Sequence, residues 1–194
     1  TIEGLEEAER AIDQAIRIDK DFARAYATRA ELAFYKRDWK NLMAYAEKAY
    51  ELAPKDAANV GHISYIVANS GAGCNSAKEY IDKYNIDKDA CKRLEWGGEV
   101  AKIANKLDAV SSLTFDNYGI GNYAYHKGDW QDMVDIMELV PTPDFHWWNM
   151  FMGLGYHYLG ETAKAKEFLD KAKTMYGENP AEKFYEASTM WNLS

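Results

Sequence analysis

Residues 23–56 read ARAYATRAELAFYKRDWKNLMAYAEKAYELAPKD, and this stretch decides the fold of the chain. Its pattern predicts two short antiparallel helices joined by a tight turn at residues 36–38. The small side chains of Ala30, Ala46 and Ala49 allow the two backbones to approach closely. Pro54 ends the second helix, because proline lacks an amide donor and clashes with the preceding turn.

Larger side chains fill the space that the alanines leave between the two helices. They are Tyr26, Leu32, Trp39, Met43, Tyr50 and Leu52. One pair of helices cannot bury its apolar face alone, because it needs neighbours stacked on both sides. The stretch therefore predicts further copies of the same unit along the chain.

The unit resembles the tetratricopeptide repeat, a helical hairpin of about 34 residues. The resemblance rests on Tyr26, Ala30, Ala33-Phe34, Asp38-Trp39, Ala46, Ala49 and Pro54. Two positions depart from the family pattern. Arg37 replaces the glycine that joins the helices, and Leu42 replaces a small residue that opens the second helix. The resemblance implies an all-α fold, a right-handed superhelix of stacked antiparallel helix pairs that holds another molecule.

The spacing of similar residues predicts a single array over residues 1–194. Ala15 stands 34 positions before Ala49, and the segment Ala124 to Trp130 nearly repeats Ala33 to Trp39. The expected parts are a half repeat at 3–20, repeat 23–56, degenerate repeat 57–88, irregular helices 89–112, repeat 113–140, repeat 145–178 and a terminal helix 181–194.

Two segments of the expected array depart from the regular pattern. The apolar stripe within residues 99–107 predicts a helix, and Gly97-Gly98 leaves open whether residues 89–112 form one kinked helix or a short pair. Residues 71–75 are expected to be a turn with positive φ that leads into a helix at 76–84. A phosphate-binding loop is rejected there, because no strand precedes it and no Gly-Lys-Ser/Thr follows.

Composition and charge exclude several classes of protein. Apolar residues make up 47% of the chain and six are tryptophan, which excludes a disordered protein. The formal charge of −8 argues against nucleic-acid binding, which needs clustered Lys and Arg. No apolar run reaches about 18 residues, so no membrane span is expected. Cys74 and Cys91 are too few for a disulfide framework or a zinc site, which favours free thiols and the cytoplasm over a bond between them.

The first helix of each pair is expected to line the concave side of such an array. Read by register, that side is rich in aromatic residues with a polar tip, which are common at interfaces. The alternative is that these rings pack into the core of the repeats. The candidate partner-binding residues are Phe34, Tyr35, His62, Tyr65, Asn69, Tyr118, Asn122, Tyr125, His126, Trp147, His157 and Tyr158.

The sequence carries no pattern that predicts catalysis, a cofactor or a bound metal. It lacks a Ser-His-Asp spacing, G-x-S-x-G and H-E-x-x-H, so no enzyme is expected. His62, His126 and His157 fall on successive first helices, but a metal would need them to converge with further ligands. We interpret them as hydrogen-bonding residues of the concave side.

These observations predict a non-catalytic scaffold for a protein or peptide partner. The opening residues and Trp147-Trp148 also resemble the repeat regions that follow the catalytic or DNA-binding module in bacterial adenylate cyclases and winged-helix regulators. That resemblance implies a regulatory fragment of a larger bacterial signalling protein. The alternative is a sensor that binds a small ligand or peptide in the aromatic groove. Because the array starts within a repeat, a homodimer through its uncapped end is also expected.

Overall fold

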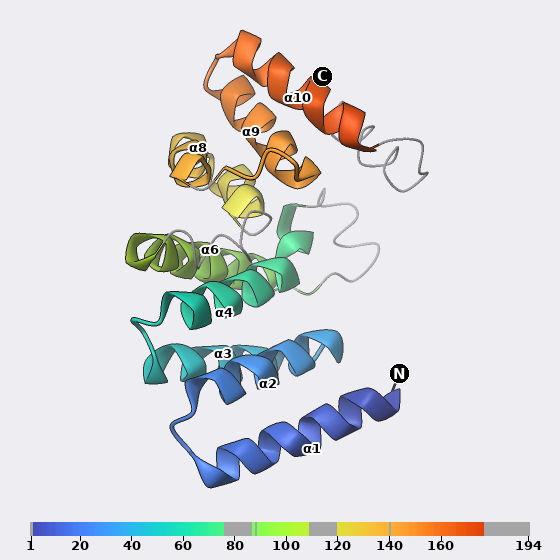
Figure 1. The fold of residues 1–194 in the computed structure, drawn as a ribbon, viewed down its shortest axis with the longest axis vertical. Coiled ribbons are helices and arrows are strands. Elements are labelled where there is room, and N and C mark those ends of the chain that lie inside the picture. The colour runs from blue at the N-terminus through green and yellow to red at the C-terminus, as the bar shows by residue number, and fades with distance from the viewer. Residues whose placement is uncertain (1, 76–86, 88, 109–119, 140, 177–194) are drawn as a thin grey trace. The chain divides into compact units, whose positions relative to one another are not determined.

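The computed structural model describes residues 2–75, 87, 89–108, 120–139 and 141–176 (Figure 1). All regular elements in these ranges are helical, which confirms the predicted all-α class for the described residues. The chain forms two compact units, unit 1 at residues 1–126 and unit 2 at residues 127–194. Several predicted features lie outside the described residues: the helix at 76–84, Tyr118, the terminal helix at 181–194, and parts of the irregular helices 89–112 and of repeat 113–140.

Unit 1 is built from helices that follow one another in space as they do in the chain (Figure 1). Helix α1 packs against α2, α2 against α3, α4 against both α2 and α3, and α6 against α4. The elements are α1 (Ile2–Ile18), α2 (Ala23–Tyr35), α3 (Trp39–Leu52), α4 (Ala57–Ser70), the short 3-10 helix η1 (Ala72–Asn75), α6 (Ala90–Leu107) and helical residues from 120 onward.

The boundaries of these helices repeat along the chain. Helix α2 begins at residue 23 and α4 at residue 57, a difference of 34. Helix α1 ends at residue 18 and α3 at residue 52, again a difference of 34. Asp38 and Asp56 precede α3 and α4, and each side chain accepts a hydrogen bond from the amide three residues on. Such caps satisfy amides that a helix start leaves without partners.

The core of unit 1 lies where α2, α3 and α4 meet. Ala30, Ala46 and Ala49 have no exposed surface, which confirms that small residues form the seams between helices. Leu42 and Ile63 are fully buried beside them. The partly buried residues that pack on this core include Tyr26, Trp39, Met43 and Tyr50, as the sequence predicted.

Three turns contain a residue with left-handed backbone at the corresponding place, two residues before the next helix. These residues are Arg37, with a φ of 55°, Gly128, with a φ of 77°, and Gly160, with a φ of 81°. The turns after α2 and α9 share one hydrogen-bond pattern, in which the following amide reaches back five residues, from Asp38 to Ala33 and from Glu161 to Tyr156. This pattern is the helix ending that normally takes glycine.

Helix α6 is unbroken through Gly97 and Gly98, which settles the question that the sequence left open. A Cβ at Gly97 would lie 2.5 Å from the backbone nitrogen of Ala68, and one at Gly98 would lie 2.2 Å from the ring of Tyr123. Close packing therefore explains this pair of glycines. The expectation of positive φ in the turn at 71–75 was wrong for Gly71, whose φ is −96° and which instead lies against α6.

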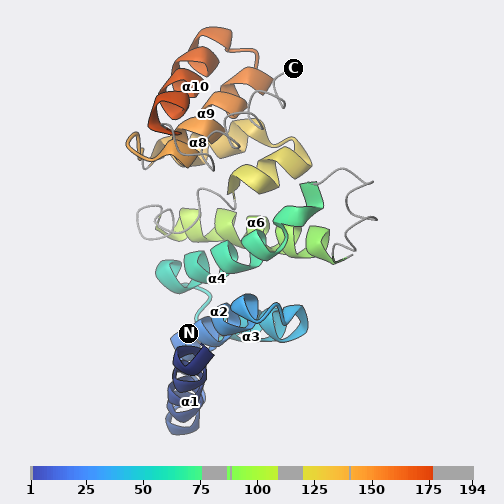
Figure 2. The same ribbon diagram turned by 90° about the vertical axis from the view of Figure 1, so that its right-hand side faces the viewer.

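Unit 2 contains α8 (Trp130–Leu139), α9 (His146–Tyr158) and α10 (Thr162–Tyr176). Helix α9 packs against α8 and α10, and both views show α9 beside α10 (Figures 1 and 2). Gly153 makes room for Leu169 of α10, and Gly155 makes room for Val134 of α8. Glycines on α9 thus allow neighbouring helices to approach closely, as alanines do in unit 1.

Candidate functional site

Unit 1 brings four of the predicted partner-binding residues onto two neighbouring helices. Tyr35 comes from α2, and His62, Tyr65 and Asn69 come from α4. Glu31 of α2 joins them, since its Oε2 lies 3.3 Å from Nε2 of His62. We call these five residues the α2–α4 surface. Tyr35 is 61% exposed and Tyr65 38% exposed, so both rings are accessible to a partner.

The carboxylate of Glu31 sets the electrostatics of the α2–α4 surface. The hydroxyl of Tyr35 donates a hydrogen bond to Glu31 Oε1 over 3.4 Å. The negative charge of Glu31 raises the pKa of Tyr35, with smaller contributions from partial burial, this hydrogen bond and Tyr65. The result is a pair of exposed aromatic rings beside one carboxylate.

The register predicts Glu31 on the same side of α2 as Tyr35, although Glu31 is not one of the candidate partner-binding residues. The i to i+4 spacing of the two residues explains their contact. Asn69 extends the surface by one turn of α4 and donates from its side-chain amide to the carbonyl of Tyr65 over 2.9 Å.

The remaining predicted residues of unit 1 lie elsewhere. Phe34 is half-buried at the edge of the core, with its ring centroid 6.3 Å from that of Trp39. Asn122 is half-buried, and Tyr125 is 39% exposed, both within the helical residues 120–127. His126 ends unit 1 and takes part in a separate cluster described below.

The predicted residues of unit 2 are mostly engaged in ring contacts. Trp147 stacks with Phe151 at a centroid distance of 6.2 Å, and Tyr158 stacks with Trp130 at 4.5 Å. His157 is exposed at the end of α9. These contacts fit the alternative that part of the aromatic set packs within the repeats.

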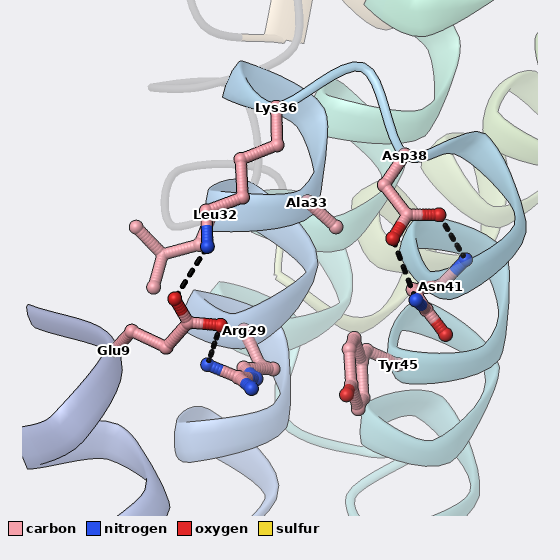
Figure 3. A pocket seen from close by; sticks show the side chains of 8 residues that line it. All are labelled: Glu9, Arg29, Leu32, Ala33, Lys36, Asp38, Asn41 and Tyr45. Atoms are coloured by element: carbon pink, nitrogen blue, oxygen red, sulfur yellow. Dashed lines mark hydrogen bonds and ion pairs between the residues drawn. The ribbon is translucent and has the colours of Figure 1, made fainter. Parts of the chain in front are cut away.

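A small pocket lies at the junction of α1, α2 and α3 (Figure 3). Its volume of about 90 Å³ is far below the roughly 300–1,000 Å³ of typical ligand pockets. Its charged groups pair with one another: Arg29 lies 2.8 Å from Glu9, and Lys36 also binds Glu9. Asp38 is engaged in capping α3. The pocket is therefore best explained as a structural ion-pair cluster.

Cys74 and Cys91 form a disulfide, so the expectation of free thiols was wrong. Helix α4 packs against α6, and η1 follows α4, so the packing carries Cys74 to the start of α6, where Cys91 lies. No pattern in the residues between the two cysteines predicts that they lie close together. His126 lies beside the disulfide, with Nδ1 3.4 Å from Cys74 Sγ and Nε2 3.1 Å from Glu95 Oε1.

A buried arginine that the sequence did not predict lies next to this region. Arg93 is 3% exposed, and its guanidinium lies 4.8 Å from the ring centroid of Trp39. It donates to the side chain and carbonyl of Ser70, at 2.9 and 3.0 Å, and pairs with Asp87 at 2.5 Å. Burial alone raises the pKa of Asp87, but the amide of Asp89 and Arg93 outweigh it, and the pKa stands below its ordinary value.

Metal-binding clusters and membrane-spanning helices are both missing from the part of the chain that the structure describes. Across those ranges, no three His, Cys, Asp or Glu side chains come together as metal ligands would. Within the same residues, no helix combines the length and the apolar character that crossing a bilayer requires.

Comparison with family models found no match, and comparison with curated proteins found no relative of this chain.

Proposed function

We propose that this chain is a non-catalytic interaction module built from stacked hairpins of the tetratricopeptide kind. The α2–α4 surface is the proposed binding site for a protein or peptide segment. The observation that carries the proposal is the Glu31–His62 pair with exposed Tyr35 and Tyr65 beside it, on two helices whose starts are 34 residues apart.

The geometry of unit 1 supports a repeat array over an isolated bundle. Both α2 and α4 would be first helices of successive repeats, and they contact one another directly as well as through α3. In stacked repeats each unit contacts its neighbours, and the first helices line one continuous side. The shared turn geometry after α2 and α9 supports the same assignment for unit 2.

The chemistry of the α2–α4 surface favours a peptide over a charged small molecule. Two tyrosine rings offer large contact areas at a low cost in conformational entropy, and their hydroxyls can bind backbone groups. Glu31 adds one acceptor, and the chain as a whole carries a charge of −8. We therefore expect a peptide with apolar side chains for the two rings and a basic or amide donor for the carboxylate.

A display experiment tests this proposal. A random-peptide library is selected on the full chain, and the affinity of an enriched peptide is measured by fluorescence anisotropy. The double variant Tyr35→Ala/Tyr65→Ala should weaken binding by at least about tenfold, because exposed aromatic anchors dominate such interfaces. Helix content, measured by circular dichroism, should stay unchanged.

Phe22→Ala is the matched control, because Phe22 is a 45% exposed aromatic residue at the opposite end of α2. It lies thirteen positions before Tyr35, about 20 Å along a helix. Equal affinity of the double variant and the wild type would show that the α2–α4 surface is not the binding site.

Other predictions remain part of the proposal. A role in bacterial signalling and a homodimer through α1 rest on the sequence alone. The expectation of a cytoplasmic location depends on free cysteines, and the Cys74–Cys91 disulfide removes that basis, since disulfides persist mainly in oxidising compartments. A sensor that binds a small ligand or peptide in the aromatic groove remains the alternative proposal, and the pocket of Figure 3 is separate from that groove.

A further inference from the structure

Cys74, His126 and Glu95 form a line of contacts that the proposed binding function does not use. Cys74 Sγ lies 3.4 Å from His126 Nδ1, and His126 Nε2 lies 3.1 Å from Glu95 Oε1. Cys91 is bonded to Cys74 and lies one turn before Glu95 on α6. All four residues belong to unit 1 and come from three separate segments of the chain.

The order of these groups is that of an activated nucleophile. A histidine within reach of a sulfur can hold the proton of the thiol, and a carboxylate on its second nitrogen fixes the orientation of the ring. A disulfide sulfur carries no hydrogen and a carboxylate only accepts, so each ring nitrogen faces an acceptor. The imidazole is thus placed to donate to Cys74 Sγ when the disulfide opens.

Access from solvent to the two cysteines is the second requirement. Cys74 and Cys91 are both half-buried, whereas a purely structural disulfide can be fully enclosed. His126 and Glu95 are also partly accessible, with side chains 25% and 45% exposed. A small thiol or disulfide can therefore approach this cluster from solvent.

We propose that Cys74 and Cys91 form a thiol–disulfide exchange site whose substrates are low-molecular-weight thiols and disulfides. In the reduced chain, the Cys74 thiolate attacks a disulfide R–S–S–R, forms a mixed disulfide and releases one R–S⁻. The Cys91 thiolate then attacks Cys74 Sγ, closes the Cys74–Cys91 bond and releases the second R–S⁻. The two cysteines lose two electrons, and R–S–S–R gains them. His126 stabilises the Cys74 thiolate, and Glu95 positions His126.

The asymmetry between the two cysteines provides the test. The full chain is reduced with a phosphine, the phosphine is removed, and oxidised glutathione is added at neutral pH. Samples are quenched with acid, and peptide mass spectrometry assigns each mixed disulfide. In the wild-type chain Cys74 should react at least about tenfold faster than Cys91, because a nearby proton donor favours its thiolate. Cys91→Ser should accumulate the mixed disulfide on Cys74.

Two substitutions separate a specific role of His126 from a general effect of charge. His126→Gln should slow the reaction of Cys74 by at least about fivefold, and Glu95→Gln should slow it less, because Glu95 acts through the histidine. Lys92→Gln is the control, since Lys92 is a charged side chain next to Cys91 that is 81% exposed and pairs with Asp89 at 2.8 Å. It should change the rate at Cys74 by less than about twofold.

Equal rates at Cys74 and Cys91 in the wild-type chain would overturn the proposal without any variant. A His126→Gln chain that keeps its helix content and reacts as the wild type does would overturn the role of the histidine. The readout is independent of peptide binding, so this proposal and the proposed function can fail separately.

Discussion

At the scale of single residues, the turn after α2 carries a conformation that its residue does not favour. Arg37 has left-handed backbone with a φ of 55°, and the turns at Gly128 and Gly160 use the same conformation with glycine. A non-glycine residue there brings its Cβ close to the following carbonyl oxygen, at a cost of roughly 1–2 kcal/mol. The turn after α2 thus adopts the left-handed backbone even though its residue is arginine and not glycine.

Arg37→Gly should raise the free energy of unfolding of unit 1 by about 1 kcal/mol, because glycine adopts this backbone without strain. Urea unfolding followed by circular dichroism measures the change. Gly160→Ala should lower stability by a similar amount, and no neighbour lies within 4 Å of the added Cβ, so any loss comes from the backbone.

Lys40→Gly serves as the opposite control, because Lys40 lies in α3 with ordinary helical backbone. Glycine inside a helix costs about 1 kcal/mol. If Arg37→Gly and Lys40→Gly both destabilise the chain, strain at Arg37 is not the explanation.

At the scale of helices, glycines in α6 set how closely its neighbours approach. Gly97 lies against the backbone of Ala68 in α4, and Gly98 lies against the ring of Tyr123. The first neighbour is backbone and cannot move aside, whereas the second is a side chain. Two adjacent glycines in one helix thus serve two different contacts.

A double-mutant cycle distinguishes these contacts. Gly98→Ala should lower the free energy of unfolding by about 1–3 kcal/mol through overpacking, and the loss should shrink when Tyr123→Ala is present. The loss from Gly97→Ala should stay the same in that background, because Ala68 remains. Urea unfolding of the wild type, the three single variants and the two double variants gives the coupling energies, and equal coupling for both glycines would contradict the assignment.

Local features of the fold could be predicted from the sequence, whereas contacts between distant segments could not. The alanine seams and the 34-residue spacing are local or periodic, so the sequence displays them. From the sequence, Gly97-Gly98 could equally have marked a break in the helix. Only the packed structure shows that other segments approach α6 closely at these two glycines.

The candidate residues show the same division. Tyr35, His62, Tyr65 and Asn69 follow from helix register, and the structure gathers them. His126 and Cys74 are 52 positions apart in the chain, and no rule of residue spacing predicts a contact at that separation.

At the scale of the whole chain, the described residues form two units, and the disulfide belongs to unit 1 alone. It joins cysteines 17 positions apart, and closing such a loop in the unfolded chain stabilises the folded state by about 3 kcal/mol. Unit 2 contains α8, α9 and α10 without a cysteine.

Reduction of the disulfide should therefore loosen unit 1 selectively. Hydrogen exchange measured by mass spectrometry should become faster in α4 and α6 after reduction and stay the same in α9 and α10, because stability differs between regions of a protein. The double variant Cys74→Ser/Cys91→Ser should show the faster exchange without reductant and no response to it. Equal acceleration in both units would contradict a local effect.

The contacts of the Arg93 guanidinium affect the order in which the helices unfold. It touches α3 through Trp39 and α4 through Ser70 while belonging to α6. Stacked repeats can open from one end, because each unit holds only its neighbours. A cation shared by three helices couples them, since opening α3 or α4 removes contacts that Arg93 makes with Trp39 or Ser70. Fraying from the amino terminus should accordingly stop at α3, and helices α3, α4 and α6 should melt in one cooperative step.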